Sequence, residues 1–246
     1  MIYIFDVDGT LVHETGGDQC IRLFQKKYIH KKTINQIKQL QVNNTVYLCT
    51  GRRLSNFLPL MKMIECDNNI MENGAVIIKD GKVDINWFTQ NKIQITNHFN
   101  VEFKLICNML EAKGFKIDYL GRYNSFWVSI DSTSNKGSLY NMQALLYAKS
   151  SLSFFISGPK VLIQPEKMNK SNAIKYLTRE KYIYIGDNSN DYQAMYNCFV
   201  PFTIDSADNE IKKLVKLKNG YVSSFGGHKG IIDILEKLLY NADNYF

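Results

Sequence analysis

The sequence predicts an α/β fold in which one parallel-sheet domain is interrupted by a separate α+β insert. Two observations lead to this prediction. At both ends of the chain, short apolar runs of strand length alternate with segments of helical periodicity. Such alternation is typical of a parallel sheet with helices on its faces. Between the two ends, strand-like runs punctuated by glycines are twice followed by a helix, as in an α+β unit.

The first part of the chain is predicted to run strand, helix, helix, strand, helix. An apolar run opens the chain, and Asp8-Gly9 marks a turn after it. Apolar residues from Ile21 to Tyr28 fall near one helical stripe, and those from Ile34 to Leu40 recur at i, i+3 and i+6. The predicted strands are residues 2–6 and 46–49, and the predicted helices are residues 18–29, 31–40 and 52–63.

After residue 75, strand-like runs punctuated by glycines replace the alternation of strands and helices. The alternation returns after residue 164. We therefore assign residues 1–75 and 165–246 to the parallel-sheet domain and residues 76–164 to the insert. Ser157-Gly158-Pro159 is typical of a hairpin turn. The insert is predicted to hold strands at 114–120, 125–130, 153–157 and 160–165 and helices at 96–112 and 135–148. Beyond it we expect helices at 169–177, 190–196, 208–217 and 230–241 and strands at 181–187 and 199–203.

The composition is that of a globular chain with enough apolar material for a core. Of the 246 residues, 45% are hydrophobic and 22% are charged. Asp6 and Asp8 break the first apolar run, and no later run approaches the ~18 apolar residues of a membrane span. We therefore expect a cytoplasmic protein with no membrane partner. The five cysteines are scattered without a C-x-x-C pair, which predicts reduced, mostly buried thiols.

The net charge of +7 admits a nucleic-acid partner. The strongest basic clusters are residues 25–32 and 211–218. Both clusters also carry apolar residues at helical spacing, so the solvated faces of two helices account for them more simply. Nucleic-acid binding therefore stays only as an alternative.

Polar residues that could carry chemistry follow the ends of the predicted strands, where ligands of open parallel sheets bind. Asp6 and Asp8 stand one residue apart, so alternation along a strand would point both carboxylates to one face, where they repel. We therefore expect a cation between them. The other candidates are Thr50, Gly51 and Arg52 after the second strand, Lys170 at a helix start, and Gly186, Asp187 and Asp191 after residues 181–185.

Each candidate alone has a structural explanation. Asp8-Gly9 occurs in many turns, and Thr50 could be an ordinary helix N-cap. Lys170 is one lysine among many, and Asp187 and Asp191 could cap a helix. Their order along the chain, each at a strand end or helix start, favours one shared site.

This ordered set resembles the haloacid dehalogenase-like phosphohydrolase superfamily. The motifs that carry the resemblance are DVDGT, TGR, Lys170 and GDNSND, while the NGA of MENGAVI and the run GDNSNDYQAM resemble its Cof-like branch. The resemblance implies a Rossmann-like core domain with a C2-type cap, which the insert would form.

The resemblance also implies roles for the acids. Asp6 would attack phosphorus and form an aspartyl-phosphate. Asp8 would protonate the leaving oxygen and then activate water, a role that partial burial beside other acids would favour. Mg²⁺ suits carboxylate, carbonyl and water ligands, and its ligands would be Asp6, the Asp8 carbonyl and Asp187, with Asp191 completing or orienting the set. The histidines His13, His30, His98 and His228 have no i, i+4 pair and are interpreted as core or surface residues.

Phosphate and substrate contacts complete the prediction. Thr50 and the Gly51 amide would bind phosphoryl oxygens, and Lys170 would pair with both the phosphate and Asp6. Asn190 would add a phosphate contact, unless it is only a turn residue. Possible substrate contacts are Arg52, Asn73 and Arg122, with Tyr123, Asn124 and Lys136 also near turns of the insert. Ordinary loop surface is the alternative for the residues of the insert.

Together these observations predict a Mg²⁺-dependent phosphatase of a small phosphorylated metabolite, with a sugar phosphate as the expected class. One alternative is a phosphosugar mutase of the phosphomannomutase type, although TGR resembles the hydrolases. Another is a basic binding protein on an inactive core, against which the complete set of acids argues. The sequence leaves the oligomeric state open.

Overall fold

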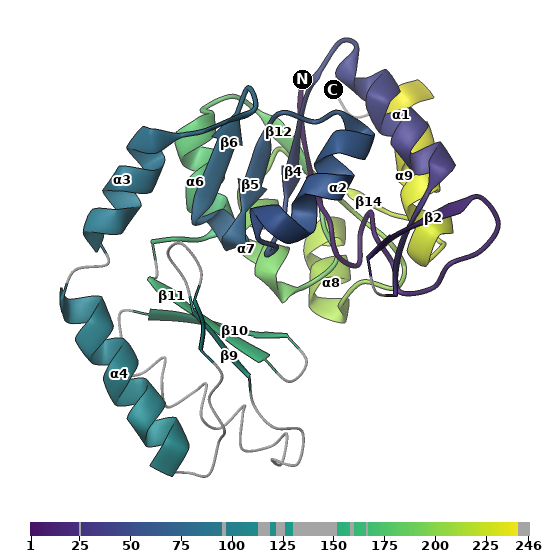
Figure 1. Ribbon diagram of the computed structural model, residues 1–246. Helices are drawn as coiled ribbons and strands as arrows, with labels where there is room; N and C mark the ends of the chain where they lie inside the picture. Colours follow the sequence, from purple (N-terminus) through teal and green to yellow (C-terminus); the bar gives the residue numbers. More distant parts are fainter. Residues whose placement is uncertain are drawn as a thin grey trace. The chain divides into compact units, whose positions relative to one another are not determined.

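The computed structural model describes residues 1–24, 26–94, 97–112, 119–121, 126–129, 152–157, 160–165 and 167–240. The chain forms two compact units, one of Met1–Val83 with Lys170–Phe246 and one of Asp84–Asn169. The first unit is an α/β domain, as predicted. Figure 1 labels most of its strands and helices.

An eight-stranded sheet forms the centre of the first unit, in the order β14-β13-β12-β1-β4-β5-β6-β7. The strands from β14 to β5 are parallel, and β6 and β7 continue the sheet antiparallel. Their bounds are β1 Ile2–Asp6, β4 Thr45–Cys49, β5 Asn69–Met71, β6 Val76–Lys79, β7 Lys82–Val83, β12 Tyr182–Ile185, β13 Val200–Thr203 and β14 Tyr221–Val222. The chain adds β4 to β7 on one side of β1 and then β12 to β14 on the other side. The strand order therefore reverses at β1.

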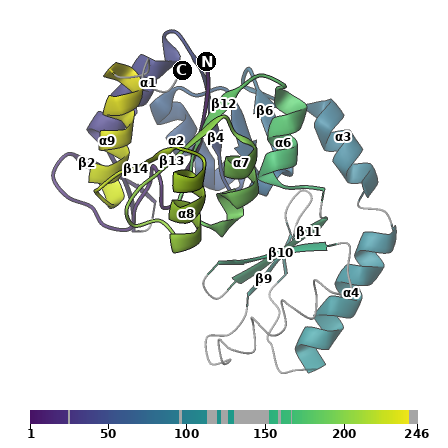
Figure 2. The same ribbon diagram turned by 180° about the vertical axis from the view of Figure 1, so that it is seen from behind.

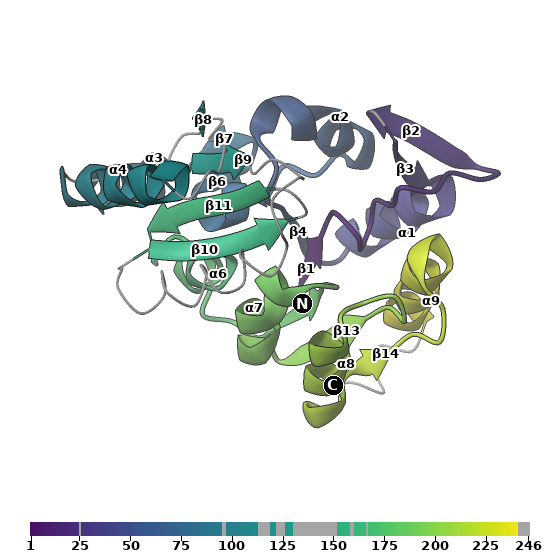
Figure 3. The ribbon, with the colours of Figure 1, turned by 90° about the horizontal axis from the view of Figure 1, so that it is seen from below.

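Helices cover both faces of the sheet. Helices α1, α2 and α9 lie on one face and α6, α7 and α8 on the other, as Figures 2 and 3 show. Their bounds are α1 Lys31–Gln41, α2 Leu54–Ile64, α6 Lys170–Leu177, α7 Tyr192–Asn197, α8 Asn209–Leu217 and α9 Gly227–Tyr240. Ile34, Ile37 and Leu40 of α1 are buried, as their spacing predicts. The all-buried β1 has the uninterrupted apolar pattern of a parallel central strand.

The helix predicted over residues 18–29 is wrong. The chain there forms a hairpin of β2 (Cys20–Phe24) and β3 (Lys27–His30). Two reciprocal backbone hydrogen bonds between His13 and Tyr28 tie β3 to the loop after β1. Such long-range pairing overrides a local apolar pattern. The basic cluster at residues 25–32 is therefore divided, with Lys27 on β3 and with Lys31 and Lys32 at the start of α1. The cluster at 211–218 lies largely on α8, as predicted.

The second unit is described in part. It contains α3 (Ile85–Gln94), α4 (Asn97–Ala112) and a four-stranded antiparallel sheet in the order β10-β11-β9-β8. The strands are β8 Tyr119–Gly121, β9 Phe126–Ser129, β10 Leu152–Ser157 and β11 Lys160–Pro165. Ser157 pairs with Lys160, which agrees with the predicted hairpin. The predicted helix at 135–148 and the candidates Arg122, Tyr123, Asn124 and Lys136 lie outside the described residues.

The limits of the two units differ from the predicted borders near residues 76 and 164. Strands β6 and β7, which were assigned to the insert, pair with β5 and extend the core sheet to Val83. The second unit then runs from Asp84 to Asn169.

All five cysteines are free, and four of them are buried, in agreement with the prediction of reduced thiols. Among the described residues, none of the helices combines the length and the apolar character that crossing a membrane requires.

Candidate active site

The carboxyl ends of three neighbouring strands bring the predicted motifs together. Asp6 is the last residue of β1 and pairs in register with Cys49 of β4, which Thr50 follows directly. Asp187 stands two residues beyond the end of β12, on the other side of β1. Ligands of open parallel sheets bind at this edge, where the strand order reverses.

Three carboxylates form the centre of this site. One oxygen each from Asp6, Asp187 and Asp191 lies within 4.8 Å of the others. Burial and the nearby Asp191 raise the pKa of Asp6 well above its usual range and that of Asp187 to about 7. Oδ2 of Asp6 is buried and has no hydrogen-bond partner among the described residues. A divalent cation among these carboxylates would relieve their repulsion, so the residues fit a hard metal ion.

Lys170 supplies the positive charge of this cluster. Its Nζ donates to Oδ1 of Asp6 at 2.6 Å and to Oδ1 of Asp191 at 2.7 Å. Burial disfavours the charged amine, but the carboxylates of Asp191 and Asp6 outweigh it and raise the pKa of Lys170 well above its usual value. The first residue of α6 is thus placed against the predicted nucleophile.

Asp191 has hydrogen bonds on both of its oxygens. Oδ1 accepts from Lys170 and, at 2.7 Å, from the hydroxyl of Tyr184. Oδ2 accepts from the backbone N–H groups of Asp187 at 3.2 Å and Asn188 at 3.4 Å. This geometry supports the orienting role for Asp191, because its bonds fix the loop that carries Asp187. Sequence reasoning missed Tyr184, which reads simply as a core strand residue.

Asp187 is held against the turn after β1. Thr10 donates its hydroxyl to Oδ1 of Asp187 at 3.2 Å, and Nδ2 of Asn188 donates to the same oxygen at 3.1 Å. Gly9 has a φ of +90°, and a Cβ at this position would lie 2.0 Å from Oδ2 of Asp187. Both the backbone angle and the space therefore require glycine here.

We expect Gly9→Ala to raise the Mg²⁺ concentration needed for half-maximal activity by at least about tenfold, because the new methyl group must displace the Asp187 carboxylate. Phosphate release measured against Mg²⁺ concentration checks this. Gly17→Ala is the matched control, since nothing lies within 4 Å of a Cβ there. Equal Mg²⁺ requirements in the two variants would contradict the placement of Asp187 at the metal.

Asp8 lies beside cations rather than beside other acids, contrary to expectation. Nε of Arg52 donates to Oδ2 of Asp8 at 2.6 Å, and Nη2 of Arg52 bonds Oδ1. Nζ of Lys27 lies 3.8 Å from Oδ1 and 3.0 Å from Oε1 of Glu14. Arg52 thus braces Asp8, and its contact with substrate stays a prediction. Lys27 went unrecognised in the sequence because its segment was interpreted as a helix face.

The second strand end supplies a compact backbone turn. Thr50 is fully buried, and its Oγ1 accepts from the backbone N–H of Arg52 at 3.1 Å. Asn73 has a φ of +54°, and its amide group would lie 3.1 Å from a Cβ at Gly51. The structure therefore brings Asn73 against Thr50 and Gly51, near the site, as the NGA resemblance implies.

Asn190 lies in the turn that precedes α7. Its backbone N–H donates to Oδ1 of Asn188 at 2.9 Å. This bond agrees with the interpretation of Asn190 as a turn residue, and its phosphate contact stays a prediction.

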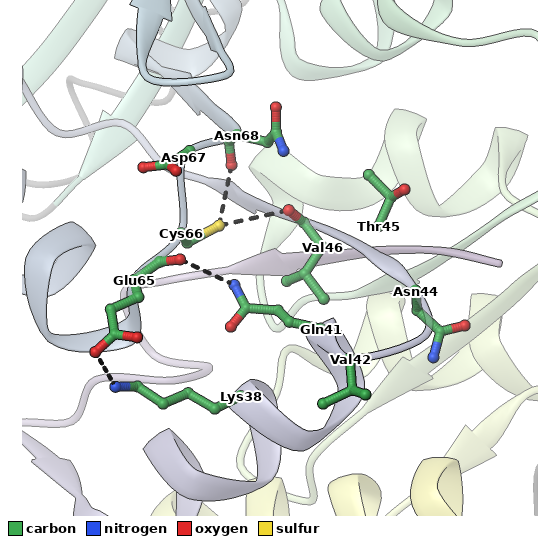
Figure 4. Close-up of a pocket in the computed structure, with 10 residues that line it drawn as sticks. All are labelled: Lys38, Gln41, Val42, Asn44, Thr45, Val46, Glu65, Cys66, Asp67 and Asn68. Carbon is green, nitrogen blue, oxygen red and sulfur yellow. Dashed lines mark hydrogen bonds and ion pairs between the residues drawn. The ribbon is translucent and has the colours of Figure 1, made fainter.

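A separate hollow of about 480 Å³ opens at the amino end of β4, as Figure 4 shows. It lies between the ends of α1 and α2, where Lys38 pairs with Glu65 at 2.5 Å. The thiol of Cys66 donates to the carbonyl of Val46 at 3.4 Å. None of the predicted site residues lines this hollow, which is at the opposite end of the strand from Thr50.

We compared the chain with models of known protein families. A family model described as haloacid dehalogenase-like hydrolase matches residues 3–136 and 78–227. A search of curated proteins found no match.

Solved structures share the fold. The sucrose-phosphatase from Synechocystis sp. PCC6803, solved with sucrose and phosphate, is 17% identical, covers 96% of both chains and has a TM-score of 0.72. A sugar phosphatase of haloacid dehalogenase subclass IIB is 15% identical over 96% of this chain and 98% of its own, with a TM-score of 0.69. A Plasmodium vivax protein described as a HAD/Cof-like hydrolase is 16% identical over 98% and 95%, with a TM-score of 0.64.

Proposed function

The chain belongs to the haloacid dehalogenase-like hydrolases, and from this premise we propose that it is a Mg²⁺-dependent phosphatase of small phosphorylated metabolites. The observation that carries the proposal is the buried cluster of Asp6, Asp187 and Asp191 around Lys170, with one oxygen of Asp6 left without a partner. A phosphoryl group and a divalent cation are complementary to such a cluster.

Asp6 is the nucleophile in this proposal. Its Oδ1 is held by Lys170, so Oδ2 is the oxygen that attacks phosphorus. The bond from phosphorus to the leaving oxygen breaks as the bond to Asp6 forms, which gives an aspartyl-phosphate. Asp6, Asp187 and the Asp8 carbonyl would hold Mg²⁺, which neutralises charge on the phosphoryl oxygens when bound.

Asp8 moves the protons. It gives one proton to the leaving oxygen, and then takes one from the water that attacks the aspartyl-phosphate. Arg52 holds both of its oxygens and so fixes the orientation of the carboxylate. Thr50 and the Gly51 amide bind phosphoryl oxygens. The charge of Lys170 lowers the pKa of Asp6 against the effect of burial and so favours the ionised nucleophile.

A sugar phosphate is the substrate class we propose. Support comes from two structural relatives whose names state sucrose-phosphatase and sugar phosphatase, each matching nearly the whole length of this chain.

The test is phosphate release by the purified protein. We expect Mg²⁺-dependent release from a generic aryl phosphate and faster release from at least one member of a panel of sugar phosphates, with both reactions abolished by EDTA. If wild type releases no phosphate from either set, the proposal is wrong. Isomerisation of a hexose phosphate without net release would indicate a mutase, and salt-sensitive binding of DNA or RNA without turnover would indicate a binding protein.

Lys27→Met is expected to slow the hydrolysis of alkyl phosphates by about tenfold and to leave aryl phosphates nearly unchanged. Lys27 lies 3.8 Å from the carboxylate of Asp8, and protonation by Asp8 matters most for leaving groups that are poor without it. Lys26→Met, at the exposed neighbouring position, is the matched control. An equal loss with both substrate classes would mean that Lys27 does not act through Asp8.

A further inference from the structure

Three of the four histidines come together beside the loop that follows β1, although the sequence indicated separate core or surface residues. His13 lies in that loop, His30 ends β3, and His228 is the second residue of α9. The ring centroids of His13 and His228 are 4.6 Å apart with an interplanar angle of 84°. The ring of His30 lies farther away, with its centroid 6.2 Å from that of His228.

The hydrogen bonds of His228 fix which of its nitrogens carries the proton. Nε2 lies 3.0 Å from the carbonyl oxygen of Thr15. Because a carbonyl can only accept, Nε2 is the donor, and the neutral ring then carries its lone pair on Nδ1. Nδ1 is buried and has no hydrogen-bond partner among the described residues. His228 thus holds one buried acceptor that nothing satisfies.

The same reasoning applies to His13. Nε2 of His13 is buried and has no hydrogen-bond partner in the described part of the chain. The backbone of Thr10 favours the protonated form of this ring and so raises its pKa, which is the effect of a nearby carbonyl. With that carbonyl at Nδ1, the lone pair of the neutral ring is on Nε2. Two neighbouring imidazoles each present a buried lone pair with no donor.

A carbonyl partner on the far nitrogen is the usual surrounding of a metal-binding imidazole, because it fixes the tautomer and the ring orientation. His228 has such a partner in the carbonyl of Thr15, and the backbone of Thr10 acts on His13 in the same sense. We propose that Nε2 of His13 and Nδ1 of His228 bind a borderline transition-metal ion of the Co²⁺, Ni²⁺, Cu²⁺ and Zn²⁺ class, with water as the remaining ligands. Imidazole nitrogen suits these ions, whereas Mg²⁺ prefers oxygen.

Both rings carry a free lone pair near neutral pH, which favours metal binding. Burial, followed by the nearby His228, lowers the pKa of His13 to about 4, and burial lowers the pKa of His228. Both rings are therefore neutral at pH 7, as a ligand must be. His30 is not part of the site, since its Nδ1 accepts from the backbone N–H of Lys32 at 3.1 Å and its ring nitrogen Nε2 then carries the proton.

The site is distinct from the acidic cluster and independent of the proposed phosphatase activity. A bound ion would join the loop after β1, which also carries Thr10, to the first turn of α9. Because Thr10 bonds Asp187, the ion would stabilise the turn beside the acidic cluster. The competing occupant is a buried water that donates hydrogen bonds to both nitrogens.

Binding of Co²⁺ to the full chain tests the proposal. Co²⁺ is titrated in excess Mg²⁺ and followed by calorimetry and by its visible ligand-field absorption. We expect a Co²⁺ site that weakens by at least about tenfold in His13→Gln and in His228→Gln, since loss of even a supporting partner costs this much. His98→Gln is the matched control, and Asp187→Asn, which removes a carboxylate of the acidic cluster, should keep the histidine site.

Three results would overturn the inference. They are no Co²⁺ binding by wild type, a Co²⁺ affinity that is unchanged in both histidine variants, and wild-type binding that disappears entirely in Asp187→Asn. If His13→Gln fails to fold, His228→Gln decides the question, because its half-buried ring lies on the first turn of a surface helix.

Discussion

Replacement of Asp6 by Asn is expected to reduce phosphate release by at least about a thousandfold, because an amide oxygen is a far weaker nucleophile than a carboxylate. The substitution keeps the size of the side chain and removes one of three mutually repelling charges. We therefore expect the variant to fold, and its thermal unfolding midpoint should be no lower than that of wild type when both are measured without metal.

The matched control for this change is Asp67→Asn, which alters an exposed carboxylate at the amino ends of the strands. It should keep wild-type activity. Initial rates with an aryl phosphate at saturating Mg²⁺ compare the three proteins. An Asp6→Asn enzyme that keeps a tenth of the wild-type rate would show that another group attacks phosphorus.

Lys170→Met is expected to lower the free energy of unfolding by about 3–5 kcal/mol in the absence of metal, and to abolish activity. Lys170 is buried between Asp6 and Asp191, with distances of 2.6 and 2.7 Å to their carboxylates. Its loss leaves two buried carboxylates without a cation. Added Mg²⁺ should recover part of the stability, because the ion binds the folded state and replaces the missing charge.

Denaturant unfolding with and without Mg²⁺ measures this effect. Lys175→Met lies in the same helix at an exposed position and should change the free energy of unfolding by no more than about 0.5 kcal/mol. Lys170→Met together with Asp191→Asn should be less destabilised than the sum of the two single changes, since the residues share one network. A Lys170→Met protein as stable as wild type without metal would contradict the ion-pair account.

The sheet and the acidic motifs could be predicted because their signals are local. A buried parallel strand appears as a continuous apolar run, and each motif directly follows such a run, as Asp6 follows Ile2–Phe5. Which motifs then meet is a matter of topology. Lys170 and Asp6 are 164 residues apart in the chain, and the family resemblance rather than periodicity connected them.

The hairpin at residues 20–30 could not be predicted from its own residues. Its apolar positions fit a helix and a strand about equally well, and the choice depends on the backbone bonds between His13 and Tyr28. Because of this error the sequence analysis did not place Lys27 beside Asp8, which it faces only from a strand of this hairpin. The predicted border of the insert near residue 76 differs from the structure for a related reason, because β6 pairs with a strand of the core sheet.

Other parts of the site depend on contacts that a sequence pattern does not report. Tyr184 alternates with apolar residues in β12, and only its hydrogen bond to Asp191 distinguishes it from a core side chain. The pairing of His13 with His228 joins residues that stand 215 positions apart in the chain. A buried tyrosine hydroxyl needs a partner, and that requirement is the signal that could have drawn attention to Tyr184.

The stereochemical course at phosphorus tests the central claim, that Asp6 forms a covalent intermediate, most directly. A phosphorothioate monoester made chiral at phosphorus with two oxygen isotopes is hydrolysed in water that carries the third isotope, and the configuration of the released thiophosphate is determined. Two successive in-line displacements, first by Asp6 and then by water, predict retention of configuration. Inversion would mean a single direct attack by water and would contradict the aspartyl-phosphate account.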